Sequence, residues 1–344
     1  MKLAVVLFNL GGPDSLDAVE PFLRNLFADP AILALPRILR VPLAWFIASR
    51  RAPFAREIYR KIGGRSPILE ETKAQAKALD KVLAARSIEA RSFIAMRCWK
   101  PFSDEVAVAV KSWGADAIVL LPLYPQFSTT TTGSALADWE RAVRKAGLKV
   151  ATATICCYPQ ADGFIAAEAE LIHQTLTRAK SGVDYRLLLS AHGLPKNIIA
   201  KGDPYQWQIE RTAEALVDRL GIKNLDWRVC YQSRVGPLDW IGPATDDEVK
   251  RAGAEGKAVI VAPIAFVSEH SETLVELDMD YAELATASGV PDYLRVPTVG
   301  VQPSFIAALA ELVSSAREGV ASSEGARLCP AKYGKCACRG VRAE

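Results

Sequence analysis

The sequence predicts an α/β protein built from two similar, doubly wound halves, each with a four-stranded parallel sheet, that face a central cleft. Short runs of Val, Ile, Leu and Ala alternate with amphipathic stretches along most of the chain. This alternation is typical of parallel sheets covered by helices on both faces. The length of 344 residues suggests about two domains. In addition, segments of the first half resemble segments of the second.

Eight strands are expected, four in each half, because their interiors are nearly continuous apolar runs. They are Lys2–Asn9, Ala90–Met96, Ala117–Leu123, Lys149–Cys157, Tyr185–Ser190, Trp227–Tyr231, Ala258–Pro263 and Asp292–Pro297. Amphipathic periodicity predicts helices at Thr72–Arg86, Ser134–Lys145, Phe164–Arg178, Asp203–Leu220 and Glu269–Ala287. We therefore divide the chain into an N-terminal half (1–157), a C-terminal half (158–318) and a cysteine-containing tail (319–344).

The internal repeat rests on two pairs of segments. Val5–Pro13 resembles Leu187–Pro195, and Val119–Gln126 resembles Ile260–Val267. In doubly wound sheets, ligands bind beyond the carboxyl ends of the strands. The polar residues that follow each strand are therefore the first candidates for a functional site.

Composition and charge exclude several classes of protein. Hydrophobic residues make up 50% of the chain and charged residues 24%, which is ordinary for a globular protein. A net charge of +3 is too small to indicate a nucleic-acid partner. The apolar run Leu3–Phe8 is short and lacks an obvious cleavage site, so we interpret it as a strand and not as a signal peptide. We expect a cytoplasmic, reducing environment.

Residues 31–48 form the most apolar stretch of the chain. Pro36, Arg37, Arg40 and Pro42 interrupt it, so it should not span a bilayer. One interpretation is a buried helix pair whose arginines reach the surface. The other is a surface segment that dips into anionic lipid, with its apolar side down and its arginines on the headgroups.

The chain has three histidines, His173, His192 and His270. His173 lies within a predicted amphipathic helix and is expected to be structural. His192 follows a strand, and the neighbouring Gly193 and Pro195 indicate a tight turn that would hold the imidazole toward a cleft. An imidazole is a usable base near neutral pH and a ligand for divalent transition metals.

A series of carboxylates begins at the end of another strand. Glu272, Glu276 and Asp280 are spaced i, i+4, i+8 on a predicted helix and so form one stripe. A solvated acidic face is one explanation. The other is a path for protons or cations, because like charges close together hold protons and cations more tightly. We expect Glu272 and His192 to come from opposite halves and to overhang the same crevice.

The tail contains Cys329, Cys336 and Cys338 in the spacing C-x6-C-x-C. This spacing matches neither a zinc ribbon nor a standard ferredoxin. A zinc or [2Fe–2S] site would need a fourth ligand. Cys156 and Cys157 end a predicted strand and should point to opposite faces, so at most one contributes. Cys98 and Cys230 are the alternatives, and a flexible tail without metal is the simpler explanation.

Six segments together resemble the ferrochelatases, which insert Fe(II) into a porphyrin to make haem. The segments are Ile62–Pro67, Leu123–Ser128, Thr131–Ser134, Ser190–Pro195, Tyr231–Pro237 and Ser268–Leu274. The resemblance extends from Asn9 to Val299 and implies two Rossmann-like halves. It implies that His192 and Glu272 form the pair at the metal-insertion site, with Glu276 and Asp280 guiding metal or protons.

The resemblance also implies a pocket, a substrate and a cofactor. Leu10, Arg97, Tyr124, Trp240 and Phe266 would line the porphyrin pocket. Leu10 cannot bind metal, and in this respect the sequence resembles the branch of the family that acts on protoporphyrin IX more than the branch that acts on coproporphyrin III. The resemblance therefore implies protoporphyrin IX and Fe(II) as substrates. Some members carry a C-terminal [2Fe–2S] cluster, for which Cys329, Cys336 and Cys338 are the expected ligands, with Cys157 favoured as the fourth and Cys156 left open.

Further expectations concern partners. The family implies a peripheral position on the cytoplasmic face of the inner membrane, with residues 31–48 as an apolar lip, and suggests a homodimer. No nucleic-acid partner is expected. The alternatives are a chelatase for coproporphyrin III or another tetrapyrrole, a porphyrin or haem carrier without catalysis, and an iron–sulfur redox or sensing protein.

Overall fold

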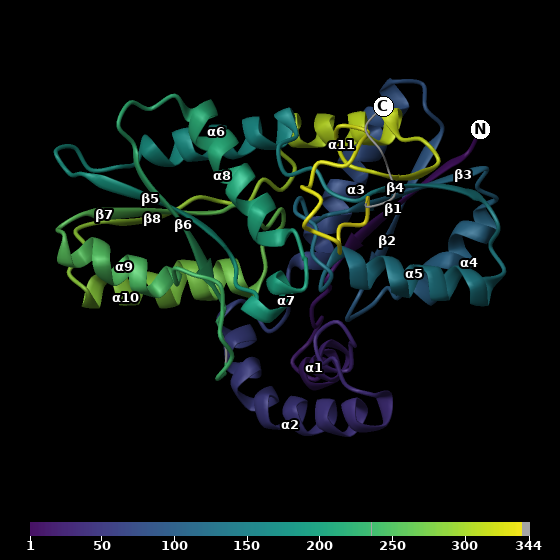
Figure 1. Cartoon of the computed structure of the whole chain (residues 1–344), viewed down its shortest axis with the longest axis horizontal. Coiled ribbons are helices and arrows are strands. Elements are labelled where there is room, and N and C mark those ends of the chain that lie inside the picture. Colours follow the sequence, from purple (N-terminus) through teal and green to yellow (C-terminus); the bar gives the residue numbers. More distant parts are fainter. Residues whose placement is uncertain (235, 339–344) are drawn as a thin grey trace. The chain divides into compact units, whose positions relative to one another are not determined.

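The structure, a computed structural model, describes residues 1–234 and 236–338 (Figure 1). The end of the predicted tail, 339–344, lies outside the described residues. The chain divides into two compact units. Unit 1 comprises Met1–Cys157, Leu309–Arg327 and residues 337–338, and unit 2 comprises the described residues of Tyr158–Ala308 together with Leu328–Cys336. The chain therefore returns to unit 1 near its end.

Each unit contains one parallel sheet, and the two sheets repeat the same strand order. The order is β2-β1-β3-β4-β9 in unit 1 and β6-β5-β7-β8 in unit 2. This confirms the α/β class and the internal repeat, because β1 and β5 hold equivalent places, as do β3 and β7. The prediction of four strands in each half is wrong for unit 1. A fifth strand, β9 (Gly319–Ala321), pairs with β4, and its three residues are too few to show a strand pattern.

The strands agree with the prediction to within a few residues at their ends. They are β1 (Leu3–Asn9), β2 (Ala90–Met96), β3 (Ala117–Pro122), β4 (Ala151–Ile155), β5 (Tyr185–His192), β6 (Asp226–Gln232), β7 (Ala258–Pro263), β8 (Tyr293–Arg295) and β9. The helices are α1 (Val19–Phe27), α2 (Arg37–Lys61), α3 (Ile68–Ala85), α4 (Ser103–Trp113), α5 (Thr132–Ala146), α6 (Asp162–Leu176), α7 (Lys196–Ala200), α8 (Tyr205–Leu220), α9 (Thr245–Ala254), η1 (Glu272–Asp280), α10 (Tyr281–Ala287) and α11 (Pro303–Ser315).

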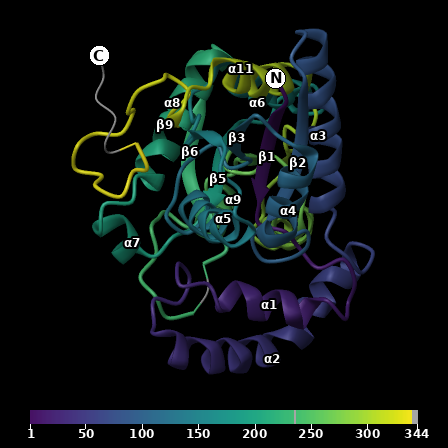
Figure 2. The ribbon, with the colours of Figure 1, turned by 90° about the vertical axis from the view of Figure 1, so that its right-hand side faces the viewer.

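In unit 1, α4 and α5 lie side by side on one face of the sheet and bury its apolar side chains. Trp139 of α5 packs edge-on against Phe8 of β1 at the centre of this core. Helices α1 and α2 pack against each other beyond the strands (Figure 2).

The outer surface of α2 tests the first of the two interpretations of residues 31–48. Ile38 is 82% exposed, Phe46 57% and Trp45 54%. The interpretation as a buried helix pair is therefore wrong, because the large apolar side chains face outward. In the part of the chain that the structure describes, no helix combines the length and the hydropathy needed to cross a bilayer.

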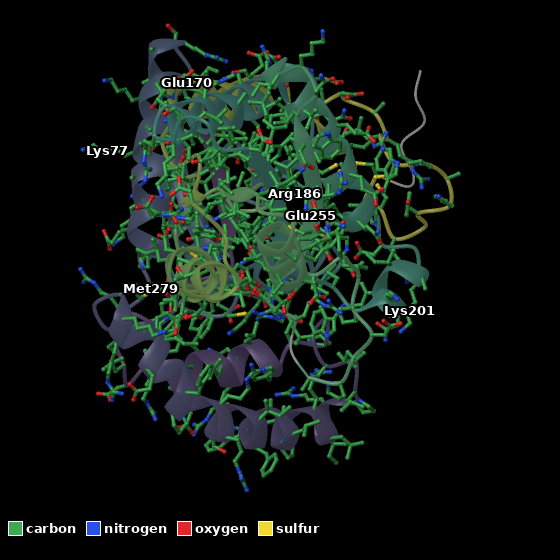
Figure 3. The ribbon with its side chains drawn as sticks, turned by 90° about the vertical axis from the view of Figure 1, so that its left-hand side faces the viewer. Lys77, Glu170, Arg186, Lys201, Glu255 and Met279 are labelled. Atoms are coloured by element: carbon green, nitrogen blue, oxygen red, sulfur yellow. The ribbon has the colours of Figure 1, made fainter. Side chains whose placement is uncertain are left out.

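In unit 2, α6 and α8 cover one face of the sheet, and α9 and α10 cover the other (Figure 1). Strand β5 is central and pairs with both β6 and β7. Because the strand order reverses direction between β5 and β7, their carboxyl ends flank a topological switch point, where such sheets bind ligands. At the opposite end, buried Arg186 of β5 is paired with Glu255 (Figure 3).

The acidic segment after β7 folds differently from the prediction. A single α-helix was expected over Glu269–Ala287, but Glu272–Asp280 forms a π-helix that continues as α10. In a π-helix the hydrogen bonds run from i to i+5, so the turn is wider than in an α-helix. Such turns are rare and occur often at functional sites.

Candidate functional site

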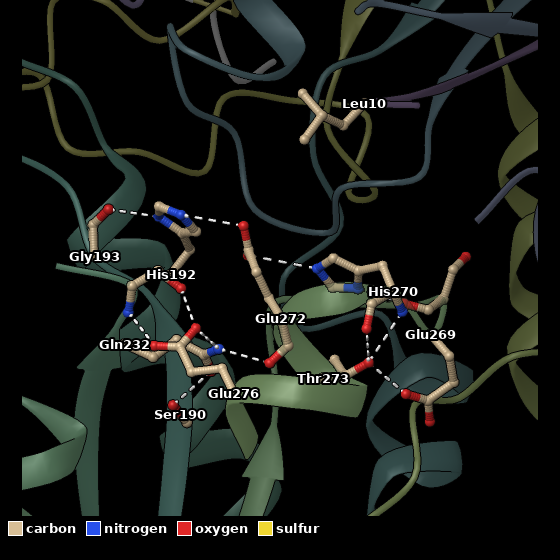
Figure 4. A network of polar contacts seen from close by, with 12 residues as sticks. Leu10, Ser190, His192, Gly193, Gln232, Glu269, His270, Glu272, Thr273 and Glu276 are labelled. Atoms are coloured by element: carbon tan, nitrogen blue, oxygen red, sulfur yellow. Dashed lines mark hydrogen bonds and ion pairs between the residues drawn. The ribbon is translucent and has the colours of Figure 1, made fainter. Parts of the chain in front are cut away.

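His192 is the last residue of β5 and lies in register with Gln232 of β6. Its Nδ1 lies 2.6 Å from the carbonyl oxygen of Gly193 (Figure 4). A carbonyl only accepts, so Nδ1 carries a proton, and in the neutral form of the ring Nε2 is the nitrogen with the lone pair. A Cβ at position 193 would come within 3.0 Å of the Gln232 carbonyl oxygen, so the turn that orients the imidazole needs glycine.

Glu272 faces this imidazole. His192 Nε2 lies 3.7 Å from Glu272 Oε1. Both residues belong to unit 2, so the prediction that they come from opposite halves is wrong. The reason is the strand order, because β5 and β7 are neighbours in one sheet and their carboxyl ends bring the following residues together.

A second imidazole, which the sequence reasoning did not assign a role, contacts the same carboxylate. His270 Nε2 lies 3.4 Å from Glu272 Oε2, and its Nδ1 is 3.0 Å from the Ser268 carbonyl oxygen. Burial would raise the pKa of Glu272, but His192 and His270 outweigh it and lower the pKa to about 2. Burial lowers the pKa of His270, yet Glu272 raises it overall. In the sequence, the position of His270 directly beside the carboxylate series could have indicated a role at the site.

Glu276 lies four residues after Glu272 on the π-helix and accepts hydrogen bonds from uncharged donors. They are the backbone N–H of Ser233 at 2.8 Å, the hydroxyls of Ser233 and Tyr281, and the Gln232 amide at 3.2 Å. Ser190 donates to the Gln232 oxygen and so turns the amide nitrogen toward Glu276 and the Glu272 carbonyl oxygen. The sequence did not single out Gln232 and Ser233 as functional candidates, although Gln232 ends β6 and Ser233 follows it directly.

Two other acidic side chains near this π-helix, Asp280 and Glu269, lie in different environments. Asp280, at the end of the π-helix, is exposed. Glu269 lies outside the π-helix and is 2.8 Å from Arg295, which together with Thr273 and the Thr298 N–H lowers the pKa of Glu269 against the effect of burial. The wide turn thus carries Glu272 and Glu276 near the strand ends and Asp280 in solvent.

The two expected pocket residues of unit 2 lie near these groups. The ring of Phe266 is centred 4.6 Å from that of His270. Trp240 is half-buried, and a β-bridge pairs its backbone with Pro195, three residues after His192. Both are therefore close in the chain or in space to the imidazoles.

The three expected pocket residues of unit 1 each follow a strand of its sheet. Leu10 follows β1 and packs against the core formed with α1 and α2. Arg97 follows β2, forms an ion pair of 2.9 Å with buried Asp29 and donates to Ser134. Tyr124 follows β3, and burial raises the pKa of its hydroxyl well above the usual value.

The cysteines fall into both units. In unit 1, the Sγ atoms of Cys156 and Cys338 are 2.7 Å apart, and those of Cys156 and Cys157 are 3.3 Å apart. Strand β4 ends at Ile155, so the expectation that Cys156 and Cys157 point to opposite faces of a strand is wrong. In unit 2, Cys329 accepts a hydrogen bond from Gln208 at 3.0 Å, and Cys336 is buried.

Cys98 and Cys230 lie elsewhere. Burial raises the pKa of each thiol to about 12, which is unfavourable for a metal-binding thiolate. Among the described residues, no group of three or more His, Cys, Asp or Glu side chains is arranged to hold a metal ion. The imidazole–carboxylate pair of His192 and Glu272 offers two donor groups.

The sequence of this chain is similar to those of known proteins over nearly its whole length. The Ferrochelatase family model matches residues 2–317. A ferrochelatase of Phenylobacterium zucineum is 57% identical over 343 residues, and one of Caulobacter vibrioides is 52% identical, each covering 98% of both chains. Among solved structures, SirB from Bacillus subtilis with Fe3+ covers 92% of this chain and 96% of its own, at 14% identity and a TM-score of 0.53. The likeness to SirB shows a shared fold.

The family match covers β1 to β8, and therefore both sheets except β9, together with the residues around His192 and Glu272. Members of this family are lyases that insert iron into protoporphyrin IX in haem biosynthesis. The chain belongs to the ferrochelatase family and is an enzyme of this kind.

Proposed function

We propose that His192 and Glu272 are the catalytic pair of this ferrochelatase. The observation that carries the proposal is the 3.7 Å separation between His192 Nε2 and Glu272 Oε1 at the switch point of the second sheet. When the imidazole is neutral, Nε2 is the ring nitrogen with the lone pair, because Nδ1 faces the Gly193 carbonyl oxygen, and Glu272 is ionised at neutral pH. An imidazole thus stands beside an anion.

The reaction needs both a proton acceptor and an anion that can guide the metal. A free-base porphyrin carries two N–H protons, and the metal enters only when the ring bends and exposes its nitrogen lone pairs. A pocket that binds the bent ring more tightly than the flat ring lowers the barrier. In our proposal His192 Nε2 accepts a pyrrole proton, and Glu272 guides Fe(II) or accepts the second proton. A two-donor set leaves most coordination positions of Fe(II) for the four porphyrin nitrogens.

Protons and Fe(II) need a route between this pair and solvent. We infer that Glu276 and Asp280 provide it, because Asp280 is exposed and Glu276 lies between it and Glu272 on the π-helix. The donors on Glu276 are neutral, so its charge is stabilised without being cancelled. For the macrocycle, Phe266 and Trp240 are the proposed contacts in unit 2, and Leu10, Arg97 and Tyr124 remain proposals in unit 1.

The proposal is tested by anaerobic incubation of the chain with Fe(II) and protoporphyrin IX, followed by absorption spectra. His192→Ala should reduce insertion by about 100-fold or more while the protein still binds porphyrin. His173→Ala is the matched control, because His173 is exposed on α6. Near wild-type turnover of His192→Ala would show that another group is the base. A parallel assay with coproporphyrin III tests the preference for the ring.

We further propose that the tail carries a [2Fe–2S] cluster. The residue chemistry supports this, since thiolates are the usual cluster ligands and Cys329, Cys336, Cys338, Cys156 and Cys157 are all buried. Among the described residues these side chains are not grouped to hold a metal ion. When bound, the cluster would supply a one-electron redox centre and an additional crosslink of the fold.

The cluster is tested by the visible spectrum and by iron and sulfide analysis of protein purified anaerobically. Serine substitutions of Cys329, Cys336 and Cys338 should each abolish the cluster. Cys156→Ser and Cys157→Ser identify the fourth ligand, because only one of these two variants should lose the cluster. An unchanged spectrum in the tail variants would remove the proposal.

We also propose that α2 binds the surface of anionic membranes. Ile38, Trp45 and Phe46 are exposed, and Arg37, Arg50 and other arginines lie on the same helix. Such a surface can insert its apolar side chains at the headgroup boundary. Phe46→Asp should weaken sedimentation with phosphatidylglycerol vesicles, whereas Val108→Asp, at an exposed position on α4, should not. Equal binding of both variants would contradict the proposal. A homodimer remains a prediction for analytical ultracentrifugation.

A further inference from the structure

Arg97, one of the proposed pocket residues of unit 1, is held by two side chains from other elements. Its Nη2 lies 2.9 Å from Oδ2 of Asp29, which follows α1, and its Nε donates at 2.7 Å to Oγ of Ser134 in the first turn of α5. The Ser134 hydroxyl donates in turn to the same Asp29 oxygen. The three side chains thus form a closed triangle that binds one edge of the guanidinium.

The third nitrogen of this guanidinium is left over. No residue in the described part of the chain binds Arg97 Nη1, and the Arg97 side chain is 19% exposed while that of Asp29 is 3% exposed. Because a guanidinium is planar and rigid, fixing the edge formed by Nε and Nη2 also fixes the direction of Nη1. The triangle therefore presents one oriented donor.

The backbone at Arg97 is fixed without the help of Asp29. The Arg97 N–H donates to the Asn9 carbonyl oxygen at 2.9 Å. Asn25 of α1 donates to the carbonyl oxygen of the next residue, Cys98, at 3.0 Å. Loss of the contact with Asp29 should therefore free the guanidinium and leave the backbone in place.

The other oxygen of Asp29 holds the turn that follows α1. Asp29 Oδ1 accepts from the Ala31 N–H at 2.8 Å. The Asp29 carbonyl oxygen accepts from the N–H groups of Ile32 and Leu33 at 3.1 and 2.9 Å. One carboxylate thus serves the turn with Oδ1 and the arginine with Oδ2.

We propose that Asp29 is a positioning residue for the reaction, which together with Ser134 fixes the Arg97 guanidinium so that Nη1 can donate to the bound macrocycle. The inference rests on the proposed function in one respect, that Arg97 lines the porphyrin pocket. A side chain that is already ordered loses less conformational freedom when the substrate binds. The anion of Asp29 supplies this order, because a charge-assisted hydrogen bond is stronger than a neutral one.

Asp29→Asn separates the two tasks of the carboxylate. Asparagine keeps an oxygen that can accept from the Ala31 N–H, but its NH2 group cannot accept from Arg97 or Ser134. The variant should raise the KM for protoporphyrin IX by about 10-fold, with kcat and the KM for Fe(II) nearly unchanged, since a contact to the porphyrin alone is weakened. An equal rise in the KM for Fe(II), or a fall in kcat of this size, would overturn the proposal.

Glu20→Gln is the matched control. Glu20 lies on α1 and also pairs with arginines, Arg24 and Arg56, but it has no contact with Arg97. Its kinetic constants should stay within about 2-fold of wild type, as expected for a distant, independent site. A rise in the porphyrin KM as large as that of Asp29→Asn would show a general effect of losing an ion pair and would overturn the assignment of Asp29.

A double-mutant cycle shows whether Asp29 acts through the arginine. Arg97→Met removes the guanidinium and should itself raise the porphyrin KM. In the Arg97→Met background, Asp29→Asn should change kcat/KM by less than about 2-fold, because nothing remains for the carboxylate to position. An equal loss in both backgrounds would mean that Asp29 acts on the fold and not on Arg97, and the proposal would be wrong.

The outcomes separate this inference from the pocket assignment on which it rests. Wild-type kinetics of Arg97→Met contradict the place of Arg97 in the pocket. Impaired Arg97→Met together with wild-type Asp29→Asn overturns the positioning role alone. If Asp29→Asn does not fold, Ser134→Ala decides the question, because it removes the partner of Nε and keeps the ion pair. Its effect on the porphyrin KM should also disappear in the Arg97→Met background, and an effect that persists there overturns the proposal.

Discussion

The two ends of the second sheet carry buried charges of opposite character. At the amino end, Arg186 donates to both oxygens of Asp226 and lies 2.6 Å from Glu255, and Lys257 also binds Asp226. Burial would raise the pKa of Asp226, but Arg186 and Lys257 lower it to about 2. Two cations thus face two carboxylates, and the Arg186 guanidinium stays charged across the whole accessible pH range.

At the carboxyl end, six residues further along β5, Glu272 and Glu276 have no arginine or lysine partner in the described contacts. Glu272 is held by two imidazoles and Glu276 by neutral donors. The pKa of Glu272 is also about 2, but imidazoles lose their charge near neutral pH. The same shift therefore has a permanent cause at one end and a titratable cause at the other. We infer that the amino end serves stability and that the carboxyl end serves exchange with substrates.

The largest expected effect is on catalysis at the carboxyl end. Glu272→Gln should lower kcat/KM by about 100-fold or more, because the anion beside His192 disappears. Glu276→Gln should lower it by about 10-fold, since Glu276 acts further from the ring. Both variants should unfold in urea at nearly the wild-type midpoint. A larger loss for Glu276→Gln than for Glu272→Gln would contradict the relay along the π-helix.

The next effect is on stability at the amino end. Arg186→Met should lower the unfolding free energy by about 2–3 kcal/mol, because Asp226 loses its bidentate partner while Lys257 and solvent still compensate part of its charge. The kcat/KM of the folded variant should change little. Arg228→Met is the control, since Arg228 is exposed and 4.0 Å from Asp226, and it should cost less than about 1 kcal/mol. Equal losses in urea unfolding would contradict the contrast.

The smallest effect is the pH dependence of stability, which distinguishes the two causes. The pKa of His270 is raised in the folded state, so its contribution is complete below about pH 6.5 and is lost as the pH rises through the folded value. The pKa of Asp226 is lowered, so its contribution is present above about pH 4 and is lost as the pH falls toward 2.

Urea unfolding across pH measures both contributions. His270→Gln should flatten the decline of stability above neutral pH, and Asp226→Asn should flatten part of the decline in acid. Glu272 titrates in the same acid range, so some acid dependence should remain in Asp226→Asn. A His270→Gln profile that follows wild type above neutral pH would show that the imidazole adds no stability there.

The strands and helices were largely predictable, because each central strand is an apolar run between helices with clear periodicity. The exceptions have physical causes. Strand β9 is three residues long and exists because it pairs with the edge of β4. The π-helix replaces an α-helix because its neighbours, such as Ser233 and Tyr281, hold Glu276 in the wide turn. Neither kind of contact can be read from local periodicity.

The repeat also shows where sequence comparison ends. In the aligned segments Leu10 holds the position of His192, so equivalent strand ends carry an inert side chain in one unit and a base in the other. Residue type, spacing and position after a strand identified His192, Glu272, Glu276 and Asp280 as candidates. They did not reveal that His192 and Glu272 lie at the end of one sheet, that His270 contacts the same carboxylate, or that Gln232 orients Glu276.

Apolar periodicity and motifs in a fixed order were enough to predict the fold class, the strand repeat and the family. Which side chains meet depends on the tertiary arrangement. Distance and burial depend on strand order, on the width of one helical turn and on close glycine contacts, and these bring together residues that lie far apart along the chain.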